Sequence, residues 1–333
     1  IAKAMSMNPR VIFFDEPTSA LAQDETEMLF KLIRELSKKD VIIIYISHRL
    51  QELWEIADTC SVLRDGKYVG TLDMTTATHK ELLNYMFGDV AVRERPADVK
   101  PGARTVMRVE HLTSEPLFRD INFELKEGEV LGIAGMLGAG RTELLRSIFG
   151  ADKPKSGEIY VENAKVKANN PMEMKKHGLA FIPEDRKSEG LVQILSIRNN
   201  LNHASLSRIT TGGFVDGSKE KDFSEAQIEG LSIKISGDEY PMTSLSGGNQ
   251  QKVVVGKWLN SEPKILLFDE PSRGIDVNAK QQIFQIVWEL SRKGLSSIVV
   301  SSELEELLEV CNRIIVMQDG EFTQEVNPDD LKV

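Results

Sequence analysis

The chain carries the same acidic motif twice. Residues 13–20 read FFDEPTSA and residues 267–274 read LFDEPSRG, so Asp15 and Asp269 stand 254 positions apart. The repeat continues at this offset without a gap: residues 49–53 match 303–307, and Asp65-Gly66 matches Asp319-Gly320. Such a repeat indicates two copies of one domain type in a single chain. Because only one phosphate-binding loop lies between the copies, we expect the first copy to be partial.

Length and charge limit the kinds of partner. A chain of 333 residues with 41% hydrophobic residues is long enough for about two domains with sizeable cores. Its net charge of −10 argues against a nucleic-acid surface, because phosphate backbones require a basic footprint. A partner protein, or a small anion held in a local pocket, is compatible with this acidic balance.

The sequence shows neither a signal peptide nor an apolar run near the ~20 residues that span a bilayer. Its two cysteines, Cys60 and Cys311, have apolar neighbours, so we expect reduced core thiols. The chain opens at Ile1 inside a helix pattern and without a methionine. We therefore expect a fragment, or a chain whose first part was removed.

Hydrophobic periodicity divides the chain into two blocks. In residues 1–88 strand and helix patterns alternate, and a helix near residues 26–38 carries an apolar stripe at Leu29, Leu32, Ile33 and Leu36. Residues 89–105 are charged, hold two prolines and lack periodicity, which is typical of a linker. Residues 106–333 contain the complete alternating pattern, interrupted at 191–242 by a stretch with few strand signals. This order predicts α/β domains with buried parallel strands.

A glycine-rich loop, GMLGAGRT at residues 135–142, follows a strand pattern and opens a helix. Its small residues are Gly135, Gly138, Ala139 and Gly140. They let backbone N–H groups curl around a phosphate at a helix N-terminus, and Thr142 is placed to ligate Mg²⁺. Arg141 stands where such loops carry lysine, and its planar guanidinium does not replace a compact ammonium without rearrangement. We expect nucleotide binding here without fast turnover.

Each acidic motif places two carboxylates at the end of an apolar strand pattern, where ligands of parallel sheets bind. The first carboxylate of a pair can hold Mg²⁺, and the second can orient or deprotonate an attacking water. The sequence thus predicts Asp15 and Asp269 as metal ligands, and Glu16 and Glu270 as catalytic residues.

A second anion-binding segment, LSGGNQQK at residues 245–252, precedes a helix and lies 24 residues before Asp269. Ser246, Gly247 and Gly248 would present backbone N–H groups at the helix N-terminus. By itself such a segment is an ordinary serine N-cap. Its spacing to Asp269 favours a nucleotide-binding role.

These motifs carry a resemblance to a known family. GAGRTEL, PEDRKSEGL, LSGGNQQK and DEPSRGID resemble the ATP-binding-cassette ATPases of bacterial monosaccharide importers of the ribose and galactose type, over nearly all 333 residues. That family fuses two cassettes in one chain. The resemblance implies a P-loop NTPase fold, in which a RecA-like core joins an antiparallel β subdomain and a helical subdomain. It also implies a partial cassette at 1–88 and a complete one at 106–333.

The resemblance further implies that two cassettes face each other head to tail, with ATP between the P-loop of one and the LSGG of the other. By position, His48 resembles the switch histidine, whereas Ser302 stands at the matching place of the second copy. Glu184 occupies the place of the glutamine that senses Mg²⁺ and contacts the membrane partner. Phe118 is the nearest aromatic upstream of the P-loop that could stack on adenine. We therefore expect two unequal sites, of which the Arg141 site is slow.

The family's role implies an ATPase with ATP and Mg²⁺ as cofactors, peripheral on the cytoplasmic face of the bacterial inner membrane. Its partners would be transmembrane permease subunits and a periplasmic sugar-binding protein, with no nucleic acid. Import of nucleosides or a signalling molecule stays open in place of sugar import. Two functions outside transport also stay open: a soluble twin-cassette ATPase acting on ribosomes or DNA, and a degenerate nucleotide-binding regulator.

The partial first copy would lack two nucleotide-binding motifs. Ile1 corresponds to Val255, beyond Leu245, so the first P-loop and the first signature would both be missing. We expect the isolated chain to bind ATP weakly at residues 135–142 and to hydrolyse little of it. The strand at residues 11–14 would have an exposed sheet edge and could pair with another chain, giving a homo-oligomer.

Overall fold

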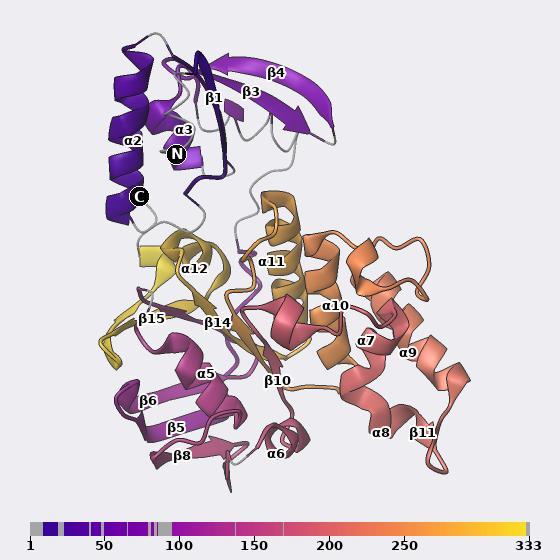
Figure 1. The fold of residues 1–333 in the computed structure, drawn as a ribbon. Coiled ribbons are helices and arrows are strands. Elements are labelled where there is room, and N and C mark those ends of the chain that lie inside the picture. The colour runs from indigo at the N-terminus through magenta and orange to yellow at the C-terminus, as the bar shows by residue number, and fades with distance from the viewer. Residues whose placement is uncertain are drawn as a thin grey trace. The chain divides into compact units, whose positions relative to one another are not determined.

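The structure is a computed structural model that describes residues 9–18, 23–39, 41–47, 50–64, 66–78, 81–82, 85, 95–136, 138–168 and 170–330. The chain forms two compact units, Ile1–Val92 and Arg93–Val333 (Figure 1). The division falls inside the stretch expected as a linker. From residue 95 that stretch belongs to the second unit, where Val99 is buried and Asp98 forms an ion pair with Arg292 at 2.7 Å.

The first unit is built from two small sheets and two described helices. Its elements are β1 (Val11–Asp15), α2 (Gln23–Ser37), β2 (Ile42–Ile46), α3 (Leu50–Ile56), β3 (Thr59–Arg64) and β4 (Lys67–Asp73). β1 and β2 pair in parallel, and β3 and β4 form an antiparallel hairpin. The predicted stripe on α2 is confirmed, because Leu29, Ile33 and Leu36 are buried against the inner face of β1.

The second unit has a six-stranded central sheet, in the order β10-β13-β14-β7-β15-β16. Its strands are β7 (Val130–Ala134), β10 (Leu179–Ile182), β13 (Ile265–Asp269), β14 (Ser296–Ser301), β15 (Arg313–Gln318) and β16 (Glu321–Val326). All neighbours are parallel except β15 and β16. One face packs with helix α5 (Arg141–Phe149), and the other packs with α11 (Val277–Arg292) and α12 (Leu304–Val310). This is the α/β arrangement predicted from the sequence.

Two further parts complete the second unit. An antiparallel sheet contains β6 (Phe118–Lys126), β5 (Thr105–Ser114), β8 (Ser156–Val161) and β9 (Ala164–Val166). A helical part contains α7 (Ile197–Asn202), α8 (Leu206–Ile209), α9 (Gly217–Gly230) and α10 (Gly247–Leu259), with a short hairpin of β11 (Thr210–Thr211) and β12 (Phe214–Val215). Helix α6 (Pro171–Lys176) precedes β10. The stretch at 191–242, where the sequence shows few strand signals, contains α7, α8 and α9 and only the two short strands of the hairpin.

The offset of 254 maps β1, β2, β3 and β4 of the first unit onto β13, β14, β15 and β16 of the second. In the second unit β7 lies between β14 and β15 and joins them into one sheet. Among the described residues of the first unit no strand takes that place, so β1-β2 and β3-β4 remain separate sheets.

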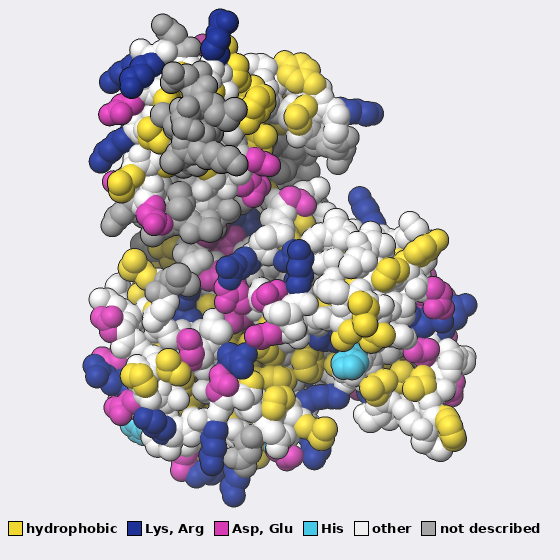
Figure 2. All heavy atoms as spheres, in the orientation of Figure 1, with side chains coloured by type: hydrophobic (Ala, Val, Ile, Leu, Met, Phe, Trp, Pro, Cys, Tyr) yellow, Lys and Arg dark blue, Asp and Glu magenta, His cyan; other side chains and the backbone are white. Residues whose placement is uncertain are grey.

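One face of the β1-β2 sheet is open to solvent. Phe13 is 69% exposed and Ile44 is 42% exposed, whereas their counterparts Leu267 and Ile298 are fully buried, in the cluster that includes α5. Hydrophobic side chains are accordingly visible on the surface of the first unit in Figure 2. Its exposed apolar area arises because no described helix covers this face as α5 covers its counterpart.

Both cysteines are unpaired, with Cys311 buried and Cys60 half-buried, and burial raises the pKa of each thiol. Within the ranges that the structure describes, no helix has the length and apolar character needed to cross a membrane.

Candidate functional site

The phosphate-binding loop connects β7, which is buried along its whole length, to helix α5. Gly138 and Gly140 have φ angles of 82° and 95°, a left-handed conformation that favours glycine. A Cβ atom on Gly140 would also collide with the carbonyl oxygen of Leu117. Gly140 caps α5 without a side-chain hydrogen bond, so the first N–H groups of the helix can bind an anion. The loop therefore has the form of a phosphate cradle; Leu137 lies outside the described residues.

Asp269, the last residue of β13, lies against this loop. Thr142 Oγ1 donates a hydrogen bond of 3.1 Å to Asp269 Oδ1, which joins residues 127 positions apart. Asp269 is fully buried, and its Oδ2 has no hydrogen-bond partner within the described chain. Burial raises the pKa of Asp269 to about 6. A buried carboxylate oxygen without a partner, next to a threonine hydroxyl, is a place where a cation would be stabilised.

The donor set fits Mg²⁺. Among the described residues no group of three or more histidine, cysteine, aspartate or glutamate side chains could hold a metal ion. Mg²⁺ needs no such group, because it is usually bound by one or two carboxylates together with phosphate oxygens and waters. Asp269 and Thr142 supply hard oxygen atoms of this type. A bound nucleotide would have to supply most of the remaining ligands.

Glu270 is held by three contacts at the end of the same strand. Its N–H donates to Val300 O at 3.0 Å, and its side chain accepts a hydrogen bond from Ser302 Oγ at 3.3 Å. Arg141 Nη2 lies 3.3 Å from Glu270 Oε1. Burial raises the pKa of Glu270 despite this cation. The P-loop arginine thus pairs with the carboxylate expected to be catalytic.

The acidic pair of the first unit has the same backbone geometry. The φ angles of Glu16 and Glu270 are 44° and 45°, and Glu16 N–H donates to Ile46 O at 2.9 Å, matching the bond of Glu270. Asp15 and Glu16 are exposed, unlike the buried Asp269. His48, the predicted switch histidine, lies outside the described residues.

Glu184 follows β10 and forms an ion pair with Arg273, in the loop after the second acidic pair. The neighbouring Arg186 is buried and donates to the carbonyl oxygens of Arg273 and Gly274, at 2.7 and 2.8 Å. Two loops from different strands are thereby joined. The sequence alone did not single out Arg186 and Arg273, although both lie in the motifs PEDRKSEGL and DEPSRGID.

Ser246 caps helix α10, where its Oγ accepts from Asn249 N–H. Gly248 is buried, and a Cβ on it would collide with Ala279. A Cβ on Gly247 would lie 3.0 Å from Gly274 O. In the described chain, Ser246–Gly248 thus lies beside the loop that follows the second acidic pair, and no hydrogen bond or ion pair joins it to the P-loop.

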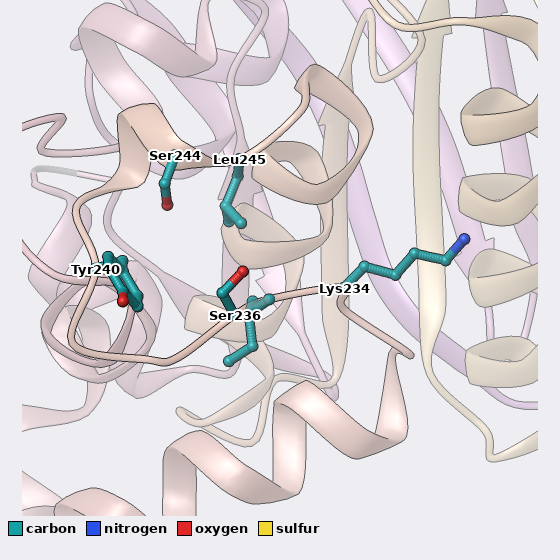
Figure 3. A pocket seen from close by; sticks show the side chains of 6 residues that line it. Lys234, Ser236, Tyr240, Ser244 and Leu245 are labelled. Atoms are coloured by element: carbon teal, nitrogen blue, oxygen red, sulfur yellow. The ribbon is translucent and has the colours of Figure 1, made fainter. Parts of the chain in front are cut away.

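A pocket of about 440 Å³ lies next to this segment. It is lined by Lys234, Ile235, Ser236, Tyr240, Ser244 and Leu245. Figure 3 shows the Tyr240 ring and the Ser236 and Ser244 hydroxyls around it, with the Lys234 side chain extending away from them. The pocket contains no residue of the P-loop or of the acidic pairs.

The expectation that Phe118 could stack on adenine is wrong. Phe118 is 1% exposed and belongs to the core cluster between the antiparallel sheet and α5. Its neighbour Leu117 is 46% exposed, and the carbonyl oxygen of Leu117 borders Gly140 of the P-loop. The register of β6 directs the Phe118 side chain into the core. Its position in the sequence, close to the P-loop, does not show which way the side chain points.

Comparisons with known proteins agree with this geometry. A sequence profile described as "ABC transporter" matches residues 118–273. A nucleotide-free ATP-binding cassette from an ABC transporter superposes with a TM-score of 0.59 at 22% identity, covering 67% of this chain and 92% of that one. A dimeric bacterial ABC transporter cassette gives 0.57 at 24% identity, covering 67% and 98%. These solved structures show that the fold is that of an ABC cassette.

The chain belongs to the ABC transporter family. It is 42% identical over 326 residues to the ribose import ATP-binding protein RbsA of Oceanobacillus iheyensis, covering 98% of this chain and 66% of that protein. It is 41% identical to RbsA of Geobacillus kaustophilus, covering 99% and 67%. It is 39% identical to the arabinose import ATP-binding protein AraG of Vibrio parahaemolyticus, covering 100% and 66%. The chain thus spans about two thirds of the length of these relatives.

Proposed function

We propose that this chain is the ATP-binding and ATP-hydrolysing part of an importer for a monosaccharide. The observation that carries the proposal is the contact of Thr142 with Asp269, which unites the P-loop with the acidic end of β13. It occurs in a chain 39–42% identical to ribose and arabinose import ATP-binding proteins. A buried carboxylate beside a phosphate cradle is suited to phosphoryl chemistry on a nucleotide.

In this proposal the backbone of residues 135–142 binds the phosphates of ATP, and Thr142 and Asp269 hold Mg²⁺. The bound metal would neutralise charge on the phosphates. Glu270 would orient water but is paired with Arg141, so this site turns over slowly. Asp15, Glu16 and His48 would serve the faster site.

We assign residues 1–88 to the C-terminal part of a first cassette, 89–105 to a linker and 106–333 to a complete second cassette. The partners would be transmembrane permease subunits, contacted near Glu184, and a periplasmic sugar-binding protein. The location would be the cytoplasmic face of the inner membrane. The open sheet face of the first unit also supports self-association of the isolated chain.

Calorimetry with ATP and Mg²⁺ tests nucleotide binding directly. The purified chain should bind ATP, and Thr142→Val and Asp269→Asn should weaken the binding that depends on Mg²⁺. Absence of any binding at millimolar ATP would contradict the proposal. In a single-turnover assay the chain should release little phosphate, whereas brisk hydrolysis by monomeric protein would overturn the assignment of unequal sites.

The solute requires a separate experiment, because an ATPase of this kind does not touch the transported molecule. A secreted binding protein encoded beside this chain should bind a monosaccharide such as ribose in calorimetry. If it binds a nucleoside or a signalling molecule instead, the ATPase assignment stands and the sugar assignment is wrong.

A further inference from the structure

A buried glutamate occupies the same position in both units. Glu52 in α3 is 6% exposed, and Glu306 in α12, one repeat offset later in the chain, is 3% exposed. A carboxylate removed from water is costly unless hydrogen-bond donors or cations surround it. We therefore expect hydrogen-bond donors or cations around each of these two carboxylates.

Among the described residues, three hydroxyl groups donate to Glu52. Thr18 Oγ1 reaches Oε1 at 2.6 Å, and Tyr45 Oη and Ser47 Oγ both reach Oε2 at 2.8 Å. Thr18 stands two residues after Glu16, in the turn that follows the first acidic pair. Ser47 directly follows β2. The carboxylate thus joins the turn after the acidic pair to the end of the neighbouring strand.

The second unit repeats two of these three bonds. Ser272 Oγ reaches Glu306 Oε2 at 2.6 Å, and Ser301 Oγ reaches the same atom at 2.9 Å. Ser272 and Ser301 are the counterparts of Thr18 and Ser47 at offset 254. The third donor differs, because Lys280 Nζ lies 3.1 Å from Oε1 where the first unit uses Tyr45. The bonds that both units keep are those that tie the turn to the strand end.

The tied turn begins at a strained residue. Glu16 and Glu270 have left-handed φ angles of 44° and 45°, which a glutamate adopts only where its surroundings impose them. Their N–H groups bond the neighbouring strand, at Ile46 O and Val300 O. Two residues later, the hydroxyl of Thr18 or Ser272 bonds the buried glutamate. The turn is therefore held at both ends. The backbone of Glu16 or Glu270 bonds the neighbouring strand, and the hydroxyl two residues later bonds the buried glutamate. We call this buried glutamate, Glu52 or Glu306, the clamp glutamate.

We propose that Glu52 is a positioning residue that fixes the carboxylate of Glu16 through the hydroxyl of Thr18, and that Glu306 does the same for Glu270 through Ser272. This inference rests on the proposed ATPase function. A carboxylate suits the role, because its two oxygens offer acceptor sites for three donors, whereas the single oxygen of an amide has two lone pairs. In this role each buried glutamate acts on the direction of the catalytic side chain.

The test compares two substitutions at Thr18, measured in the importer complex that the proposed function assigns to this chain. Thr18→Val keeps the shape and removes the donor, whereas Thr18→Ser keeps the donor. Steady-state ATP hydrolysis should show a kcat at least tenfold lower for Thr18→Val, with KM for ATP within about twofold of the unmodified protein. Thr18→Ser should return kcat to within about threefold.

Tyr45→Phe is the matched control, because it removes one donor to the same carboxylate without freeing the turn after Glu16. It should lower the melting temperature about as much as Thr18→Val does. Its kcat should stay within about twofold of that of the unmodified protein. An unchanged kcat for Thr18→Val, a proportional rise of KM, or an equal loss of kcat in Tyr45→Phe would each overturn the inference while leaving the ATPase function intact. Absence of hydrolysis by the unmodified protein would overturn both.

Discussion

Arg141 of the P-loop and Glu270 at the end of β13 form an ion pair, with Nη2 and Oε1 3.3 Å apart and side chains only 6% and 11% exposed. A nearly buried pair is difficult to break, because separation leaves a charge without compensation. A nucleotide phosphate entering the loop must compete with Glu270 for the same guanidinium. This competition would give a physical reason for the slow turnover that we propose at the Arg141 site, beyond the replacement of lysine.

Neutralising the competitor should therefore strengthen nucleotide binding. Glu270→Gln keeps the shape of the side chain and removes its charge, so Arg141 becomes available to phosphate. We expect ATP affinity to rise about tenfold, which corresponds to about 1.4 kcal/mol. Calorimetry with ATP and Mg²⁺ measures it, and Glu305→Gln, an exposed carboxylate on α12, serves as the charge-matched control. Equal or weaker binding by Glu270→Gln would show that the ion pair does not compete with nucleotide.

The regular helices and strands could be predicted because they depend on the spacing of apolar residues along the sequence. The stripe of Leu29, Ile33 and Leu36 recurs every three or four residues, and the burial of a helix face follows from that period alone. β7 and the start of α5 at Arg141 were also predictable, since a short apolar run bounded by glycines has few structural solutions.

The contacts of the site depend on side-chain directions, which spacing does not contain. That Arg141 pairs with Glu270, and that Phe118 points into the core, follow only from the folded register of the strands. The clamp glutamates are an intermediate case. Glu52 and Glu306 already match in the sequence repeat, but their donors become visible only when the strand ends and the turns are brought together.

The free energy of unfolding of the second unit should depend on pH through the titration of Lys257. Its Nζ donates to Gly190 O at 2.6 Å in a buried site, and burial lowers the pKa of Lys257 from 10.5 to about 8. Between about pH 8 and pH 10.5 the unfolded chain keeps this proton after the folded protein has lost it, so stability rises with pH in this window. Below pH 8 the folded protein bears the full cost of the buried charge.

This dependence can be isolated by comparison with Lys257→Met, which cannot titrate. Relative to that variant, the unmodified chain should gain up to about 3 kcal/mol in free energy of unfolding from about pH 7 to about pH 10.5. Urea unfolding at several pH values measures the difference. Lys293→Met, at an exposed position, should show no such trend. A constant difference between the chain and Lys257→Met would refute the assignment.

The open face of the β1-β2 sheet should make the chain prone to self-association. Phe13 and Ile44 are exposed on a sheet that no third strand extends among the described residues. Phe13→Lys and Ile44→Lys together should reduce light scattering and the weight-average mass in sedimentation. Both changes lower the net negative charge, which by itself would favour association, so a decrease reports on the apolar face.

A lysine placed off this face provides the control. Leu63 on β3 is 73% exposed, and Leu63→Lys adds positive charge of the same kind without altering the β1-β2 sheet. We expect its self-association to match that of the unmodified chain. If Leu63→Lys disperses the chain as well as the double variant does, loss of exposed apolar area in general, rather than this face, governs association.

Arg186 should be the main support of the loop that follows the second acidic pair. Its guanidinium donates to the carbonyl oxygens of Arg273 and Gly274, and burial lowers the pKa of Arg186. Arg186→Met fills similar space but leaves both carbonyl groups without their donor. Because Arg273 and Gly274 are exposed and a hydrogen bond contributes a net ~0.5–1.5 kcal/mol, loss of both bonds should lower the free energy of unfolding by about 1–3 kcal/mol.

Urea unfolding of Arg186→Met measures this loss, and Lys187→Met tests whether any basic residue of the segment has the same effect. Lys187 is exposed, so its substitution should stay within about 0.5 kcal/mol. ATP affinity supplies a second measurement, because the freed loop begins directly after Glu270 and its movement would shift that carboxylate relative to Arg141. A stable Arg186→Met variant would mean that the ion pair of Glu184 with Arg273 alone holds the two loops together.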